Sequence, residues 1–274
     1  MVAPKVWARV GALACVALLI GGCDASSTTF GNGVNSSSTT LANIRAIDAE
    51  VCSSSSGAEV ALGSTSGVVS WPSVGQTLTY GAVTGYTTGT PSTSEAEYAI
   101  VGGSNVASGT GVLTAGGFYT IAVTGECSAP AGSAGLGPAV VQIQDNYPTS
   151  IPSGDAAIRV VNLAPSTNTL YQQYDLYSGA TAITGLTDVA YGSVSNGGTY
   201  VDVAAGTSLN LKLYSHAAGA TTSELVSSTV MSYSSAAKLN VFTPAAGGVY
   251  TIWIYGSPDS NNGTLFAGFQ QDVE

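Results

Sequence analysis

The sequence predicts an all-β protein with two tandem immunoglobulin-like antiparallel β-sandwich domains. Charged residues make up only 8% of the 274-residue chain and hydrophobic residues 45%. Small and β-branched residues are abundant, and this composition favours strands over disorder. Apolar residues alternate with a period of two, as in Leu209–Tyr214 and Tyr250–Tyr255. Turn signals recur about every ten residues, which leaves about seven short strands in each stretch of about 110 residues, as in an immunoglobulin-like sandwich.

A repeated pattern divides the chain into two units. Four short sequences return in the same order, with offsets of 114, 111, 131 and 127 residues: Ala42–Ala46 as Ala156–Val160, Leu78–Val83 as Val189–Val194, Gly116–Ile121 as Gly247–Ile252, and Gln144–Asp145 as Gln271–Asp272. Four matches in order indicate two homologous units whose loops differ in length. We therefore expect one sandwich at residues 41–147, a linker with two prolines at 148–155, and a second sandwich at 156–274.

The first 40 residues are predicted to be a leader and a tether. Lys5 and Arg9 flank the start of an apolar stretch, Val10–Ile20, whose 11 residues suit a signal peptide and are too few to span a membrane. The sequence Ile20-Gly21-Gly22-Cys23 resembles the lipobox of bacterial lipoproteins, in which the cysteine thiolate takes a diacylglycerol. We expect a signal peptide at 1–22, lipid on Cys23 and a flexible Ser/Thr/Gly tether at 23–40. The alternatives are ordinary signal cleavage nearby or an uncleaved anchor.

The charge of the mature chain limits its partners. Two of the six basic residues lie in the leader, so four remain against 16 acidic residues, a net charge of −12. Nucleic acid and anionic lipid surfaces require clustered basic residues, so neither is expected to bind directly. We expect an exported protein in the cell envelope, on the periplasmic or the surface face. Its lipid anchor would reach the membrane, and its partner would be an unknown envelope protein or a glycan.

The mature chain keeps two cysteines besides Cys23, and both lie in the first unit. Cys52 and Cys127 have no counterparts in the second unit, which suggests that they occur as a pair. An exported protein meets an oxidising environment, so we predict a disulfide between them, with two free thiols as the alternative. The closed loop of 76 residues would stabilise the fold by about 4 kcal/mol on the chain-entropy estimate.

The second unit resembles a known family. It reads Ile158-Arg-Val-Val-Asn-Leu-Ala-Pro-Ser166, then Tyr174-Asp-Leu-Tyr177, Val189-Ala-Tyr-Gly-Ser-Val194, Ala205-Gly-Thr207 and Tyr250-Thr-Ile-Trp-Ile-Tyr-Gly256. These strands and turns are similar to those of the bacterial envelope family called domain of unknown function 4397. The first unit would be a divergent copy, which departs most at Asp48–Cys52. The resemblance implies an immunoglobulin-like fold and an envelope location, and it implies no catalytic residues.

Residues suited to catalysis or metal binding are few. His216 is the single histidine, and its surroundings, Tyr214–Gly219, predict a solvated loop. No metal site and no catalytic triad are therefore expected. Asp48 with Glu50, and Glu95 with Glu97, have the period-two spacing of an exposed strand face, which we interpret as solvated. The chain is accordingly predicted to be non-enzymatic, without a cofactor other than its covalent lipid.

Two other functions remain open from the sequence. A carbohydrate-binding or adhesive module would use exposed aromatic rings, for which Trp71 and Trp253 are candidates, although tryptophan in a sandwich usually fills the core. An envelope hydrolase would use a carboxylate pair in a cleft, with the two groups about 5–10 Å apart. Exposed coplanar rings would favour the first function, and such a cleft the second.

The mature chain has two arginines, and they occupy the same place in the two units. Arg45 and Arg159 each follow an isoleucine on the opening strand, and each unit closes with Gln-Asp, at Asp145 and Asp272. First and last strands of a sandwich commonly lie close together, so a guanidinium and a carboxylate could form a bidentate pair. We predict Arg45 with Asp145 and Arg159 with Asp272. The alternative is two copies of an anion site.

Overall fold

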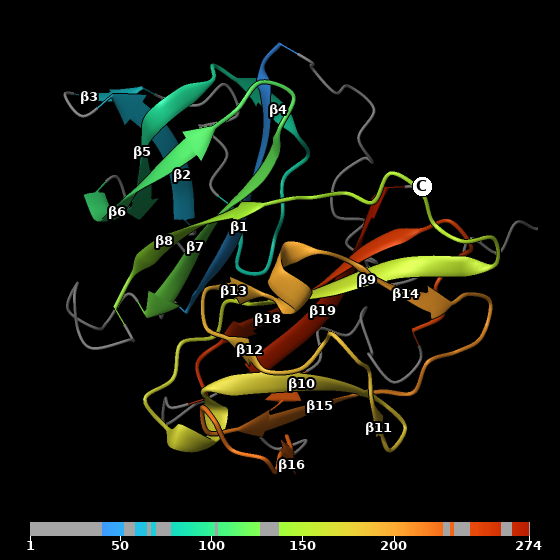
Figure 1. Cartoon of the computed structure of the whole chain (residues 1–274). Coiled ribbons are helices and arrows are strands. Elements are labelled where there is room, and N and C mark those ends of the chain that lie inside the picture. The colour runs from blue at the N-terminus through green and yellow to red at the C-terminus, as the bar shows by residue number, and fades with distance from the viewer. Residues whose placement is uncertain are drawn as a thin grey trace, which may run out of the picture.

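The computed structural model describes residues 40–51, 58–64, 67–69, 78–101, 104–126, 137–226, 231–232, 242–258 and 265–273 (Figure 1). The predicted all-β sandwich class is confirmed: the ordered elements are strands, apart from two short 3-10 helices, η1 (Thr169–Tyr171) and η2 (Ser195–Gly198). The expected signal peptide, Cys23, nearly all of the tether, Cys52, Cys127 and Trp71 lie outside the described residues.

Strands from the first half of the described chain form two sheets. Inner sheet 1 has the order β4 (Thr87–Gly89), β1 (Ala42–Val51), β7 (Phe118–Glu126), β8 (Ala139–Gln144). Outer sheet 1 has the order β3 (Gly67–Val69), β2 (Ala58–Ser64), β5 (Ser92–Val101), β6 (Ser104–Leu113). Figure 1 shows both sheets together, coloured from blue to green.

Strands from the second half, coloured yellow to red in Figure 1, form two further sheets. Inner sheet 2 has the order β13 (Ser193–Val194), β9 (Asp155–Asn162), β18 (Val249–Gly256), β19 (Leu265–Val273), β17 (Met231–Ser232), and β14 (Val201–Ala204) also pairs with β9. Outer sheet 2 has the order β11 (Thr181–Ala182), β10 (Gln173–Ser178), β15 (Leu211–His216), β16 (Glu224–Leu225), and β12 (Val189–Ala190) also pairs with β10.

The four sheets stack as layers, outer, inner, inner, outer, with a buried apolar cluster between each neighbouring pair. Ile44 and Ile121 of inner sheet 1 pack with Val60 of outer sheet 1. Ile158 of inner sheet 2 packs with Leu176 of outer sheet 2. A third cluster joins the two inner sheets to each other: Ile47, Ala49, Val83, Ala122 and Ile143 with Val161, Leu163, Trp253 and Tyr255. Both faces of each inner sheet are therefore covered, which explains why all eight residues of β18 are buried.

The strand registers of the two halves coincide. Ile44 lies opposite Tyr119 and Tyr119 opposite Gln144, and the matching residues Ile158, Tyr250 and Gln271 are paired in the same way. The turn that contains Gly81 in the first half has a counterpart at Gly192 in the second half. Both glycines adopt positive φ, +77° and +70°. Their N–H groups donate to the carbonyls of Asp48 and Asn162 at 2.7 and 2.8 Å. The similarity seen in the sequence thus extends to individual backbone contacts.

One detail of the predicted antiparallel sandwich is wrong. The opening strand of each half runs parallel to a strand near its end, β1 beside β7 and β9 beside β18, and β17 is parallel to β19. Parallel neighbours need a long crossover connection. In each half, the chain between these strands passes through the outer sheet before it returns. This arrangement places the opening strand next to the closing hairpin.

Candidate functional site

Arg45 and Arg159 meet between the two inner sheets. Each follows an isoleucine that points into the core of its own half, and because side chains alternate along a strand the arginine points the other way. That other face is covered by the other half, so both side chains are at most 1% exposed. We call Arg45, Arg159, Asp145 and Asp272, with the threonines and tyrosines that bind them, the interface cluster.

In the first half, a chain of hydrogen bonds holds the arginine and the aspartate. Arg45 Nε donates to Thr120 Oγ1 at 2.7 Å, and Thr120 Oγ1 donates to Asp145 Oδ2, also at 2.7 Å. The Tyr86 hydroxyl donates to the same carboxylate oxygen at 2.6 Å, and its ring lies 4.9 Å from the guanidinium carbon. Thr120 and Tyr86 therefore hold Arg45 and Asp145 in position through contacts within the first half alone.

The second half repeats this chain residue by residue. Arg159 Nε donates to Thr251 Oγ1 at 3.0 Å, and Thr251 donates to Asp272 Oδ2. The Tyr200 hydroxyl donates to Asp272 Oδ2 at 3.1 Å, and its ring lies 4.8 Å from the Arg159 guanidinium carbon. Thr251 and Tyr200 thus match Thr120 and Tyr86. The threonines and tyrosines were missed from the sequence, although the offset of 114 that aligns the arginines also aligns the tyrosines, and the offset of 131 aligns the threonines.

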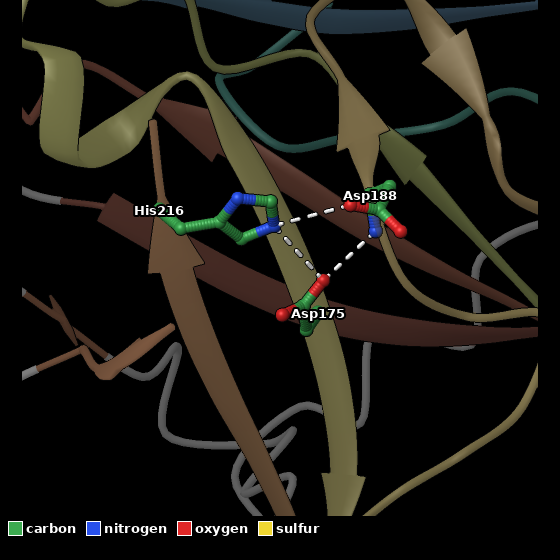
Figure 2. A group of neighbouring side chains, drawn as sticks. All are labelled: Asp175, Asp188 and His216. Atoms are coloured by element: carbon green, nitrogen blue, oxygen red, sulfur yellow. Dashed lines mark hydrogen bonds and ion pairs between the residues drawn. The ribbon is translucent and has the colours of Figure 1, made fainter. Parts of the chain in front are cut away.

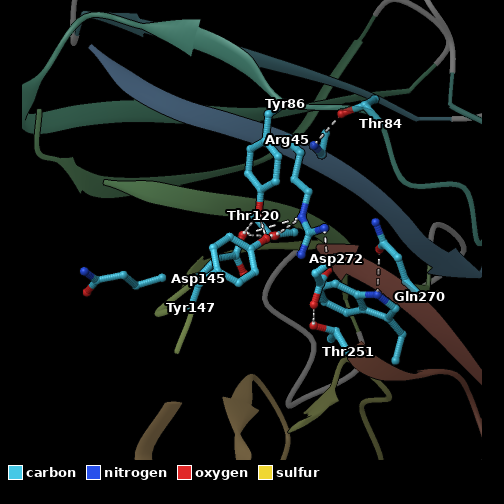
Figure 3. Close-up of polar contacts among 12 residues, drawn as sticks. Arg45, Thr84, Tyr86, Thr120, Asp145, Tyr147, Thr251, Gln270 and Asp272 are labelled. Atoms are coloured by element: carbon cyan, nitrogen blue, oxygen red, sulfur yellow. Dashed lines mark hydrogen bonds and ion pairs between the residues drawn. The ribbon is translucent and has the colours of Figure 1, made fainter. Parts of the chain in front are cut away.

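The closest ion pairs cross from one half to the other. Arg45 Nη1 lies 2.7 Å from Asp272 Oδ1 (Figure 3). Arg159 Nη2 binds Asp145 Oδ1. The predicted contact of Arg45 with Asp145 is present but longer, 3.5 Å from Nε to Oδ2. The predicted pair of Arg159 with Asp272 is wrong, because in the described part of the chain the carboxylate that Arg159 binds is that of Asp145. Threonine holds the Nε side of each guanidinium, so the Nη end reaches the opposite half.

Electrostatics favour the charged forms of Arg45 and Asp145 despite their burial. Burial disfavours the Asp145 carboxylate, but attraction by Arg45 and Arg159 outweighs it and lowers the pKa of Asp145. Burial also disfavours the guanidinium charges, yet the aspartates raise the pKa of Arg45 well above its ordinary value. Desolvation raises the pKa of Tyr86 and of Tyr200, so both hydroxyls stay neutral and donate. The arrangement of two positive and two negative groups suits a structural lock between the halves.

Asp48 and Glu50 lie further along β1 and are buried, 3% and 1% exposed. The expected solvated face is wrong here, because β1 belongs to a sheet covered on both sides. Desolvation raises the pKa of Asp48 to about 6, although backbone N–H donors oppose the shift. Desolvation, followed by repulsion from Asp48, raises the pKa of Glu50 to about 7. Glu97 is buried as well, whereas the side chain of Glu95 lies outside the described part.

His216 forms a second polar group with Asp175 and Asp188. The residue ends strand β15 and is 4% exposed, so the predicted solvated loop is wrong. Gln173 of β10 lies opposite His216, and Asp175 follows two positions later on the same face. His216 Nε2 lies 3.2 Å from Asp175 Oδ1 and 3.6 Å from Asp188 Oδ1 (Figure 2). The sequence does not signal this group, since strand pairing alone brings its members together.

Hydrogen bonds orient each member of this group. His216 Nδ1 lies 2.8 Å from the carbonyl oxygen of Ala217, which can only accept, so Nδ1 carries a proton. Asp188 precedes β12, and its backbone N–H donates to Asp175 Oδ1 at 2.8 Å. Asp188 has a φ of +58°, a conformation that aspartate tolerates better than most side chains. One imidazole nitrogen and two carboxylates are ligand types suited to a transition metal.

The His–Asp–Asp group lines a hollow of about 260 Å³ on the outer face of outer sheet 2. Thr187, Thr221, Thr222 and Ser223 line it with hydroxyl groups, and Tyr177 lies beside it. The Asp188 side chain is 67% exposed, so the hollow is open to solvent. This face points away from the core of the second half and from the interface cluster, so the two groups are independent of each other.

The tryptophan that the structure describes does not form a binding surface. Trp253 is 2% exposed, packs between the inner sheets and donates through Nε1 to Gln270 Oε1 at 3.1 Å. The expectation that it fills a core is confirmed. The rings of Tyr177 and Tyr214 pack against each other on the outer face of outer sheet 2, with centroids 4.1 Å apart and planes inclined by 31°.

Comparison with known proteins does not identify a family for this chain. Among the described residues, no helix has the length and apolar character needed to cross a membrane. No protein-family model matches the chain, and no curated protein matches its sequence.

Proposed function

We propose that the protein is a lipid-anchored component of the bacterial cell envelope whose folded part has a structural or binding role without catalysis. The lipobox-like sequence that ends at Cys23 and the low content of catalytic residue types support this proposal. On this proposal the two halves belong to the immunoglobulin-like family called domain of unknown function 4397, which the second half resembles.

The observation that carries the structural role is the interface cluster. Buried ion pairs tolerate little displacement, because a buried charge that loses its partner costs about 3–5 kcal/mol. Arg45 and Arg159 each reach an aspartate of the opposite half, so any rotation of one half against the other would break both pairs. A stiff four-layer body that follows a lipid-bearing segment is suited to presenting a surface at a distance from the membrane.

Fractionation of the native host tests the anchor. With Cys23→Ser, protein found in the membrane fraction should become soluble or accumulate as the uncleaved precursor. Cys15→Ser, a change of the same type inside the apolar leader, is the matched control and should leave the membrane fraction unchanged. If Cys23→Ser also leaves the membrane fraction unchanged, the lipid anchor is wrong.

A glycan-binding role is the second candidate, and one observation favours it. The ring of Tyr177 lines an open hollow with hydroxyl-bearing residues and packs at a tilt against the ring of Tyr214, and aromatic rings at such a site can contact a sugar. A glycan array with the purified protein, repeated with Tyr214→Ala, tests this role. Binding that disappears in Tyr214→Ala supports it, and no binding to any glycan removes it in favour of a structural role.

A further inference from the structure

We propose that Asp175, Asp188 and His216 bind one divalent transition-metal ion of the Zn²⁺ class on the outer face of outer sheet 2. This site adds a ligand to the proposed envelope role and does not depend on it. The His–Asp–Asp group is separate from the interface cluster, since outer sheet 2 packs its other face on the core of the second half.

The spacing of the three ligand atoms is the first argument. The donor atoms of Asp175, Asp188 and His216 all lie within 4.8 Å of one another. His216 Nε2 lies 3.2 and 3.6 Å from the two carboxylate oxygens. In a tetrahedral site with bonds of about 2.0–2.2 Å, neighbouring ligand atoms are about 3.3–3.6 Å apart. A metal ion thus fits among the three atoms with small movements.

The orientation of the imidazole is the second argument. The bond from Nδ1 to the Ala217 carbonyl fixes the proton of the neutral ring on Nδ1, which leaves a lone pair on Nε2. That lone pair faces two carboxylate oxygens, an arrangement that is repulsive unless a cation lies between them. Metal-bound histidines usually have their other nitrogen bonded in this way to a carbonyl or carboxylate.

The cation could also be a proton, which would make His216 an imidazolium ion paired with Asp175. The open side of the group favours the metal, because the hollow of about 260 Å³ next to the ligands has room for water molecules in the remaining coordination positions. An imidazole ligand selects zinc-like ions over Ca²⁺ and Mg²⁺, which prefer all-oxygen sites.

The single histidine makes the test direct. The protein has one His, so the ring signals in a proton–nitrogen NMR spectrum report on His216 alone. After removal of metals with EDTA, one equivalent of ZnCl₂ should shift the Nε2 signal to that of a metal-bound nitrogen, while Nδ1 stays protonated. Zinc that binds only to cysteine thiols would leave both ring signals in place, and this outcome would overturn the proposal.

Calorimetric titration with ZnCl₂ measures the contribution of each ligand. His216→Ala and Asp188→Asn should each weaken binding about 100-fold or more, because even outer-shell changes weaken metal sites about 10- to 100-fold. Asp188 is the safer change for folding, since its side chain is 67% exposed. Asp202→Asn, on the exposed face of β14, is the matched control and should bind zinc like the wild type. Equal affinity in Asp188→Asn and Asp202→Asn would refute the site, whatever the outcome for the lipid anchor.

Discussion

Carboxyl groups are buried near both ends of strand β1, but their pKa values shift in opposite directions at the two ends. Near the start of β1, Arg45 lies among the carboxylates of two halves, and Asp145 has a lowered pKa because two arginines surround it. Near the end of β1, Asp48 and Glu50 are equally buried but no arginine or lysine of the described residues pairs with them, and desolvation raises both pKa values. Burial alone therefore does not set the charge of a carboxyl group, because the presence of a cation decides the direction of the shift.

Of the changes that test this comparison, removal of the Asp145 carboxylate should have the largest effect on the free energy of unfolding. Asp145→Asn leaves two buried arginines with one carboxylate between them and should lower the free energy of unfolding by about 3–5 kcal/mol. Urea unfolding followed by circular dichroism measures the change. Asp202→Asn, which neutralises an exposed aspartate, should change it by less than about 0.5 kcal/mol. A loss below about 1 kcal/mol in Asp145→Asn would show that the cluster is not a structural lock.

The other end of β1 is where we expect a covalent link. Val51 and Glu126, the last residues of β1 and β7, lie opposite each other in the register, and Cys52 and Cys127 follow them in the sequence. Reduction should lower the free energy of unfolding by about 2–4 kcal/mol. Intact mass after alkylation of the denatured, unreduced protein decides whether the bond exists. Two alkylated thiols would rule it out.

The pH dependence of stability should distinguish Glu50, near the end of β1, from Asp145, near its start. Glu50 has an ordinary pKa of 4.5, raised to about 7 in the fold, so the folded state holds a proton that the unfolded state releases. Stability should therefore fall as pH rises from about 4.5 to about 7. Asp145 acts in the opposite sense, because its contribution is full above its ordinary pKa of 3.8 and is lost as pH falls through the lowered value.

Glu50→Gln separates the two contributions. The variant keeps the shape of the side chain without the charge, so it should gain about 1–2 kcal/mol of unfolding free energy at pH 8 and a flatter pH profile. At pH 4 the wild-type carboxyl is already protonated, and variant and wild type should be equally stable. Destabilisation at pH 8 would show that the Glu50 charge has a partner after all.

The smallest change in the free energy of unfolding is expected for a pair of variants that compares matching tyrosines of the two halves. Tyr86→Phe and Tyr200→Phe each remove a hydrogen bond to an interface aspartate, and each should cost about 1 kcal/mol in a thermal or urea unfolding experiment. Similar losses are expected because the two tyrosines occupy matching positions. A loss in one variant and none in the other would mean that the halves share geometry but not energetics.

The sequence predicts those features that depend on which residues recur. Composition and period-two alternation indicate the all-β class, and the repeat identifies Arg45, Arg159, Asp145 and Asp272 as a related set. Alternation specifies which face of a strand a residue occupies, but not what covers that face. For this reason the exchange of partners between halves and the burial of Asp48 and Glu50 were not predictable.

The His–Asp–Asp group was not predictable for a different reason. Asp175, Asp188 and His216 are far apart in the sequence, and a lone histidine in a stretch of small residues has no spacing that indicates a ligand. The pairing of β10 with both β12 and β15 is what brings them together. Strand register, which single-sequence patterns do not fix for short strands, therefore determined this part of the structure.

The reciprocal contacts of the interface cluster have the form of a symmetric dimer. Arg45 of the first half binds Asp272 of the second, and Arg159 of the second half binds Asp145 of the first. Residues across the two-fold axis of an isologous homodimer are related in the same way. A protein with one such half would need a second molecule, and its assembly would depend on concentration. In this chain the segment between β8 and β9 connects the two halves covalently, so their association is intramolecular and survives dilution. The presence of both halves in one chain thus makes this association a property of a single molecule.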